Sequence, residues 1–321
     1  MAEITRKATR SWNPLKPWRE MSVQARREAL VGYVCISPWL IGFIVFTAGP
    51  ILASLVISFM RWDIVTPPKW VGLANYIKIF TDDEDFIQAL KVTITYALVT
   101  LPLGLVLGLG ISLLLNLKIR GVDFYRTLFY IPAVLPAVAV TLLWIWIFNP
   151  EFGLINHLLS LIGIEGPRWF FSPKWALPGL MLMSLWAVGG GAVIYLAGLQ
   201  NIPPHLYEAA EVDGANSWHR FWHVTIPLLT PTIFFQLVLG LIGSFQVFVQ
   251  SYVATGGGPL KSTFFYMLYI YQTAFGSLRM GYGSALAWIL TVVILLLTIL
   301  VFTTSKYWVY YEAEKTGGFK E

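Results

Sequence analysis

The sequence predicts an all-α membrane protein with six transmembrane helices and both termini in the cytoplasm. Of its 321 residues, 57% are hydrophobic and 12% are charged, whereas an ordinary soluble domain carries roughly 25% charged residues. The charged residues cluster between long runs that contain none, so the chain lacks the polar shell that a soluble protein of this length needs. Both observations indicate insertion into a membrane.

Six runs without Asp, Glu, Lys or Arg are long enough to cross a bilayer, which requires about 20 apolar residues per helix. These runs cover residues 31–60, 92–117, 127–148, 175–199, 226–253 and 284–305. The sequence therefore predicts a cytoplasmic tail over residues 1–30, a transmembrane domain over 31–305 and a second cytoplasmic tail over 306–321. Pro38 and Pro50 are expected to bend the first span.

The distribution of basic residues sets the predicted orientation. The two tails and the segments 118–126 and 200–225 together hold 14 Lys and Arg side chains, and the segments on the opposite side hold 8. Cytoplasmic loops of membrane proteins are enriched in Lys and Arg, so both termini are predicted on the cytoplasmic side of the cell membrane. This bias also accounts for the net charge of +5, and no basic motif points to a nucleic-acid partner.

Several function classes lose support from what the chain lacks. It has no GxxxxGK[ST] phosphate loop, so ATP hydrolysis would need a separate subunit, and the chain is not expected to be an enzyme. No ionisable side chain lies within the six runs, which argues against an ion-coupled carrier. An ion-coupled carrier or a channel nevertheless stays open as the alternative to transport that is driven by a separate ATPase. The single cysteine and the pair His219 and His223 predict no metal site, and no cofactor is expected. The acidic run at residues 82–85 is expected to be a solvated turn.

A polar, helix-prone segment lies between the fourth and fifth runs, on the predicted cytoplasmic side. Its sequence over residues 206–231 is LYEAAEVDGANSWHRFWHVTIPLLTP. The residues around Glu208 favour a short helix, Gly214 allows a sharp turn, and Asn216 or Ser217 can cap a second short helix that ends before Pro227. Such a helix-turn-helix over cytoplasmic loop 200–226 can dock into a groove on a partner and push the spans on either side.

The spacing of EAA, three residues, Gly, nine residues and V-x-I-P resembles the EAA motif of ABC importer permeases, with Val224 where Ile is usual. The resemblance implies a type I importer permease whose loop couples to an ATPase through Glu208, Ala209, Ala210, Asp213, Gly214, Phe221 and Pro227. Further segments are similar to the maltose, lactose and glycerol-phosphate branch: SPWLIGF at 37–43, GLANY at 72–76, residues 129–156, TGGGP at 255–259 and YGSALAW at 282–288. This resemblance implies a second homologous permease subunit, an ABC ATPase dimer and an extracellular solute-binding protein as partners. The expected substrate is a sugar or oligosaccharide, with glycerol-3-phosphate as the alternative.

Two polar, aromatic-rich stretches are the predicted substrate path, because a hydroxyl-rich solute needs neutral donors and acceptors beside aromatic faces. The candidates are Ser184, Trp186, Gly191, Ser244, Phe245, Gln246, Phe248 and Gln250. Helix packing is an equally simple role for the three aromatic residues. Members of the family carry asparagines near the positions of Ser184 and Ser244. The chain therefore departs from the family at two positions where the substrate would bind.

Overall fold

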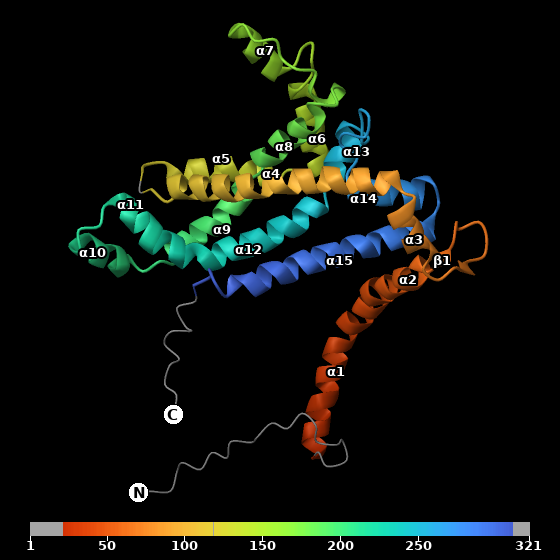
Figure 1. Cartoon of the computed structure of the whole chain (residues 1–321). Helices are drawn as coiled ribbons and strands as arrows, with labels where there is room; N and C mark the ends of the chain where they lie inside the picture. Colours follow the sequence, from red (N-terminus) through yellow and green to blue (C-terminus); the bar gives the residue numbers. More distant parts are fainter. Residues whose placement is uncertain (1–21, 118, 311–321) are drawn as a thin grey trace, which may run out of the picture. The chain divides into compact units, whose positions relative to one another are not determined.

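The computed structural model describes residues 22–117 and 119–310, which are mostly helical (Figure 1). The shorter elements around the spans are the hairpin β1 (Met60–Arg61) and β2 (Lys69–Trp70), α3 (Ala74–Thr81), α7 (Leu154–Leu161), the 3-10 turn η3 (Trp169–Phe171), α10 (Pro204–Val212), α11 (Ser217–Arg220), α14 (Tyr266–Tyr271) and the π-helix η5 (Gln272–Gly276). Residues 1–21 and 311–321 lie outside the described residues. The predicted tails 1–30 and 306–321 are therefore described only in part.

The first span is one helical run with a local widening before its second proline. The run consists of α1 (Val23–Phe43), the π-helix η2 (Ile44–Ala48) and α2 (Gly49–Ser58). Pro50 has no N–H to donate, and its ring would collide with the carbonyl four residues earlier in a regular α-helix. The wider turn of η2 precedes this proline, and Gly49 donates its N–H to the Ile44 carbonyl five residues back. Pro38 lies inside α1 without interrupting it.

Four helical runs are long and apolar enough to cross a membrane. Two bent helix pairs raise the number to six if each pair is one span. Six is the number of spans that the sequence predicts. The continuous spans after the first are α4 (Glu84–Leu115), the run from Ser217 to Ala254 and α15 (Met280–Ser305). The bent pairs are α5 (Val122–Val134) with α6 (Ala137–Ile147), and α8 (Ala176–Trp186) with α9 (Gly189–Gln200). These counts refer to the described part of the chain.

The third predicted span is not a straight helix. Its two halves meet at 100°, because Leu135 is extended, with a ψ of 142°, immediately before Pro136. A residue before proline is pushed out of the helical region by the proline ring. The bend between α8 and α9 is milder, at 41°. The runs of apolar residues located both spans, but neither break was part of the sequence prediction.

Helix α4 is the central element of the bundle, and it packs against α8, α9, α12 (Ile226–Phe245) and α14. Thr93 on α4 is fully buried and accepts a hydrogen bond of 3.0 Å from the Tyr266 N–H at the start of α14. The Tyr266 hydroxyl in turn donates to the Leu286 carbonyl on α15 at 3.0 Å. Two buried polar groups thus join α4, α14 and α15.

The glycines after the bend of the fourth span allow α5 and α9 to approach closely. A Cβ on Gly189 would lie 1.8 Å from the Phe129 carbonyl oxygen, and one on Gly190 would lie 2.9 Å from the Ala133 methyl group. Small residues are the usual means by which membrane helices bring their backbones together. Gly189 and Gly190 therefore serve helix packing.

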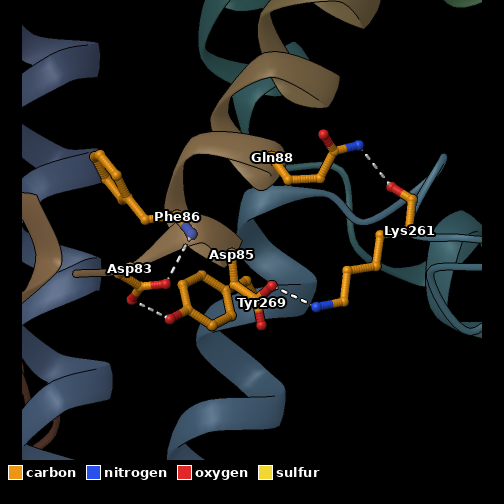
Figure 2. Close-up of polar contacts among 6 residues, drawn as sticks. All are labelled: Asp83, Asp85, Phe86, Gln88, Lys261 and Tyr269. Carbon is orange, nitrogen blue, oxygen red and sulfur yellow. Dashed lines mark hydrogen bonds and ion pairs between the residues drawn. The ribbon is translucent and has the colours of Figure 1, made fainter.

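The acidic run at the start of α4 has a fastening role: it joins α4 to α14 and α15, and is not only a solvated turn. One Asp83 oxygen caps α4 by accepting the Phe86 N–H at 3.0 Å, and the other accepts the hydroxyls of Tyr269 and Tyr282. Figure 2 shows Asp83 beside Tyr269, and the ion pair of Asp85 with Lys261 nearby. Gln88 also donates to the Lys261 carbonyl at 3.1 Å. Burial and the neighbouring carboxylate raise the pKa of Tyr269, so its hydroxyl keeps the proton that it donates.

We expect Asp83→Ala to destabilise the protein strongly, because it removes a helix cap and leaves two buried tyrosine hydroxyls unpaired. The cap contributes about 1 kcal/mol, and each unpaired buried hydroxyl costs about 1–3 kcal/mol. Thermal melting of the detergent-purified protein measures the loss. Asp82→Ala is the matched control, since Asp82 is exposed one residue earlier. Equal melting temperatures for the two variants would contradict the fastening role.

Candidate functional site

A cavity of about 340 Å³ lies among α4, α8, α9, α12 and α13 (Val249–Ala254). Its wall is formed by Tyr96, Thr100, Leu101, Gly104, Leu105, Ser184, Leu185, Val188, Gly191, Tyr195, Gln236, Gly240, Gly243, Ser244, Val247 and Gln250. The polar members are hydroxyls, phenols and amides, and none of these lining residues is Asp, Glu, Lys, Arg or His. The cavity is therefore suited to an uncharged, hydrogen-bonding surface of a solute.

The three aliphatic hydroxyls of the wall all donate to their own helices. Thr100 donates to the Tyr96 carbonyl at 2.8 Å, Ser184 to the Met181 carbonyl at 2.7 Å and Ser244 to the Leu241 carbonyl at 2.8 Å. A hydroxyl has one proton and two lone pairs. In this arrangement each of these side chains can only accept a further hydrogen bond.

The structure brings four of the eight predicted path residues to the cavity: Ser184, Gly191, Ser244 and Gln250. The other four lie elsewhere. The Trp186 ring packs edge-on against Trp144 with centroids 6.0 Å apart, Phe245 is buried in the core, and the Phe248 ring stacks on Tyr252 at 5.4 Å. Gln246 is exposed in the short break between α12 and α13.

Four polar wall residues are absent from the sequence prediction: Tyr96 and Thr100 on α4, Tyr195 on α9 and Gln236 on α12. Gln236 could have been predicted by the same reasoning as Gln246 and Gln250. Burying an amide side chain within an apolar span costs free energy unless the amide has a polar partner. The two α4 residues lie in a helix for which the sequence gave no reason to expect a path. Their role follows from the packing of α4 on α8 and α12.

The polar segment between the fourth and fifth spans forms the predicted helix-turn-helix, with one difference. Helix α10 ends at Val212, Gly214 has a φ of +79°, and Asn216 caps α11 by accepting the His219 N–H at 2.9 Å. The second helix was expected to end before Pro227, but it continues through the π-helix η4 (Phe221–Thr225) into α12 without a break. The wide turn accommodates the proline in the same way as in the first span, because Pro227 cannot donate a helical hydrogen bond.

Two contacts within this loop hold it in one shape. Arg220 pairs with Glu211 at 3.2 Å, and the hydroxyls of Tyr207 and Thr225 lie 3.0 Å apart. The predicted coupling residues form its outer surface: Glu208, Ala209, Asp213 and Gly214 are exposed, and Ala210, Phe221 and Pro227 are half-buried. A hollow of about 340 Å³ lies beside them, lined by Ala210, Asp213, Gly214, Ala215, His219, Arg220, His223 and Val224.

The loop and the Asp83 cluster lie at opposite ends of the long helices. Figure 1 shows α10 and α11 at one end of α4, α12 and α15, with α3 and α14 at the other end. Helix α12 begins at the loop and ends at the cavity wall. One unbroken helix therefore joins this loop to the cavity.

Known proteins share this sequence and this arrangement of helices. The family "Binding-protein-dependent transport system inner membrane component" matches residues 100–309. The probable ABC transporter permease protein YesP of Bacillus subtilis is 46% identical over 294 residues, which cover 90% of this chain and 95% of YesP. The trehalose/maltose transport system permease protein MalF of Thermococcus litoralis is 34% identical, covering 88% and 95% of the two chains.

A solved structure supports the same grouping. A chain of a bacterial ABC transporter involved in the import of the acidic polysaccharide alginate aligns with a TM-score of 0.76 and 26% identity, over 88% of this chain and 97% of that one. The relatives are permease subunits, which do not hydrolyse ATP themselves. The chain belongs to the family of binding-protein-dependent transport system inner membrane components, as a multi-pass permease of a bacterial membrane.

Proposed function

We propose that this chain forms half of the translocation path of an ABC importer for a sugar or oligosaccharide. The observation that carries the proposal is the cavity within the spans, whose polar groups are all uncharged. Hydroxyl-rich solutes need such groups, held weakly enough for the solute to leave again. The names of the relatives agree with this substrate class, since they refer to trehalose, maltose and alginate.

The proposed partners follow from what this chain contributes and what it lacks. A binding protein outside the membrane would deliver the solute, in keeping with the name of the family. A second, homologous permease would supply the other half of the path. An ABC ATPase dimer would supply energy, since the sequence has no phosphate-binding loop. ATP binding would close the ATPase dimer and switch the path from inward to outward access.

The proposed coupling element is the loop from Glu208 to Pro227. Its exposed, small-sided surface around Gly214 fits a groove on a partner, and its internal contacts let it move as one piece. A push on this loop would pass through η4 into α12, because the helix is continuous between them. The wall residues on α12 would then move with the ATPase.

Ser184, Gly191, Ser244 and Gln250 are the path residues that the cavity geometry supports. Gln246 is also retained in the proposal, for a different reason. It is exposed in the unwound segment between α12 and α13, where an amide at membrane depth needs a polar surrounding. The half of the path formed by the second permease would provide one.

Uptake into vesicles tests the function directly. The chain is reconstituted with its second permease, ATPase and binding protein, and uptake of labelled di- and trisaccharides is measured with and without ATP. We expect uptake that depends on ATP and on the binding protein. Uptake without ATP would favour a channel or an ion-coupled carrier.

We expect Gly214→Leu to uncouple ATP hydrolysis from uptake, or to prevent ATPase association, while membrane insertion stays normal. A Cβ at this position would meet nothing within 4 Å in this chain, so the added side chain would project into the partner's groove. The measurements are co-purification of the ATPase and the ratio of sugar carried to ATP hydrolysed.

Gly121→Leu is the matched control for this experiment. Gly121 has a φ of +80°, close to the +79° of Gly214, and its Cβ would likewise meet nothing within 4 Å. Both variants therefore carry the same backbone strain, about 1–2 kcal/mol. Normal coupling in Gly214→Leu, or the same defect in Gly121→Leu, would count against the docking role.

We expect Gln250→Ala and Gln246→Ala each to slow sugar uptake roughly two- to tenfold, since the net contribution of one hydrogen bond is about 0.5–1.5 kcal/mol. Initial uptake rates across several sugar concentrations measure the effect. Gln200→Ala should behave as wild type, because Gln200 is exposed at the opposite end of α9. Unchanged kinetics for several sugars would remove the corresponding glutamine from the path.

A further inference from the structure

Gln236 on α12 is a long polar side chain on a helix face otherwise made of small residues. The cavity-facing positions of α12 are Gln236, Gly240, Gly243 and Ser244, which share one side of a helix by their spacing of four, seven and eight residues. A side chain here is thus free to reach across the cavity towards α9.

The orientation of the Gln236 amide is set by its contact with Gly191. The Nε2 group donates to the Gly191 carbonyl oxygen at 2.9 Å. A carbonyl accepts only, so the nitrogen must face α9 and the amide oxygen must point the other way. Gly191 permits this contact because a Cβ there would lie 2.7 Å from the same nitrogen.

The Gln236 amide oxygen has no hydrogen-bond partner among the residues that the structure describes. It lies in a wall whose three aliphatic hydroxyls also have only lone pairs to offer, because Thr100, Ser184 and Ser244 donate to their own helices. Thr100, Ser184, Ser244 and Gln236 therefore bring acceptor oxygens to the lining of one cavity, beside the donors of Tyr96, Tyr195 and Gln250. A fixed acceptor in this lining is complementary to a solute hydroxyl.

We propose that Gln236, oriented by Gly191, is a specificity-determining residue that accepts a hydrogen bond from a solute hydroxyl. This inference rests on the proposed function and adds the chemical feature that is recognised. A ring oxygen or a carboxylate would gain nothing from the Gln236 oxygen, whereas a solute hydroxyl would find a fixed acceptor there.

The test compares wild type with Gln236→Met in the full reconstituted complex. Methionine has similar length and no hydrogen-bonding amide. The wild-type complex is first assayed for ATP-dependent uptake of trehalose, maltose and an alginate disaccharide. The carried saccharide is then compared with analogues that each lack one hydroxyl. Gln200→Met, the same exchange at an exposed position, should match wild type on every sugar.

We expect wild type to carry one deoxy analogue about three- to tenfold more slowly than the parent sugar. Gln236→Met should lose the same factor on the parent sugar and show no further loss on that analogue. If the variant matches wild type, or slows every analogue by an equal factor, Gln236 only joins two helices and the inference is wrong. If wild type carries no saccharide at all, the proposed function fails first, and the inference fails with it.

Discussion

The absence of water from the bilayer core is the constraint on which this structure depends. Backbone groups in a span must pair within the helix, and side-chain protons without another partner turn to the same backbone. Thr100, Ser184 and Ser244 all follow this rule. The constraint that makes the helices thus leaves these three hydroxyls with only oxygen lone pairs to face a solute, whereas the phenols of Tyr96 and Tyr195 and the amide of Gln250 can still donate.

The two ends of the long helices α4, α12 and α15 differ in the hydrogen bonds that hold them. At one end, Asp83 receives hydrogen bonds from the start of α4, from α14 and from α15, and Lys261 pairs with Asp85. At the other end, the loop around Gly214 is shaped by its own contacts and leaves its small side chains uncovered. The loop is therefore the end that the proposed coupling to a partner requires to be exposed.

Runs without charge predicted the spans and their number well, because lipid excludes charge wherever a helix crosses. Helix breaks were harder to foresee, since Pro136 forces a bend of 100° whereas Pro38 stays inside a helix. The EAA spacing predicted the loop, but not that η4 would join it to α12.

The candidate site was only partly predictable. Residue type alone could suggest Ser184, Gly191, Ser244 and Gln250, but it could not separate them from Trp186 or Phe245, which pack against other rings or the core. Tyr96 and Thr100 belong to the wall only because α4 lies beside α8 and α12. That information resides in contacts between distant segments, and no local pattern carries it.

The π-helix η4 has a consequence for the phase of α12. Each residue of an α-helix advances the direction of its side chain by about 100°, and a single π-turn spends one residue more than an α-turn before the helix resumes. Without this extra residue, every later position on α12 would face a different side, and Gly240, Gly243 and Ser244 would turn away from α4. The five residues Phe221–Thr225 therefore set the rotation of the cavity-lining face of α12 relative to the loop that precedes it.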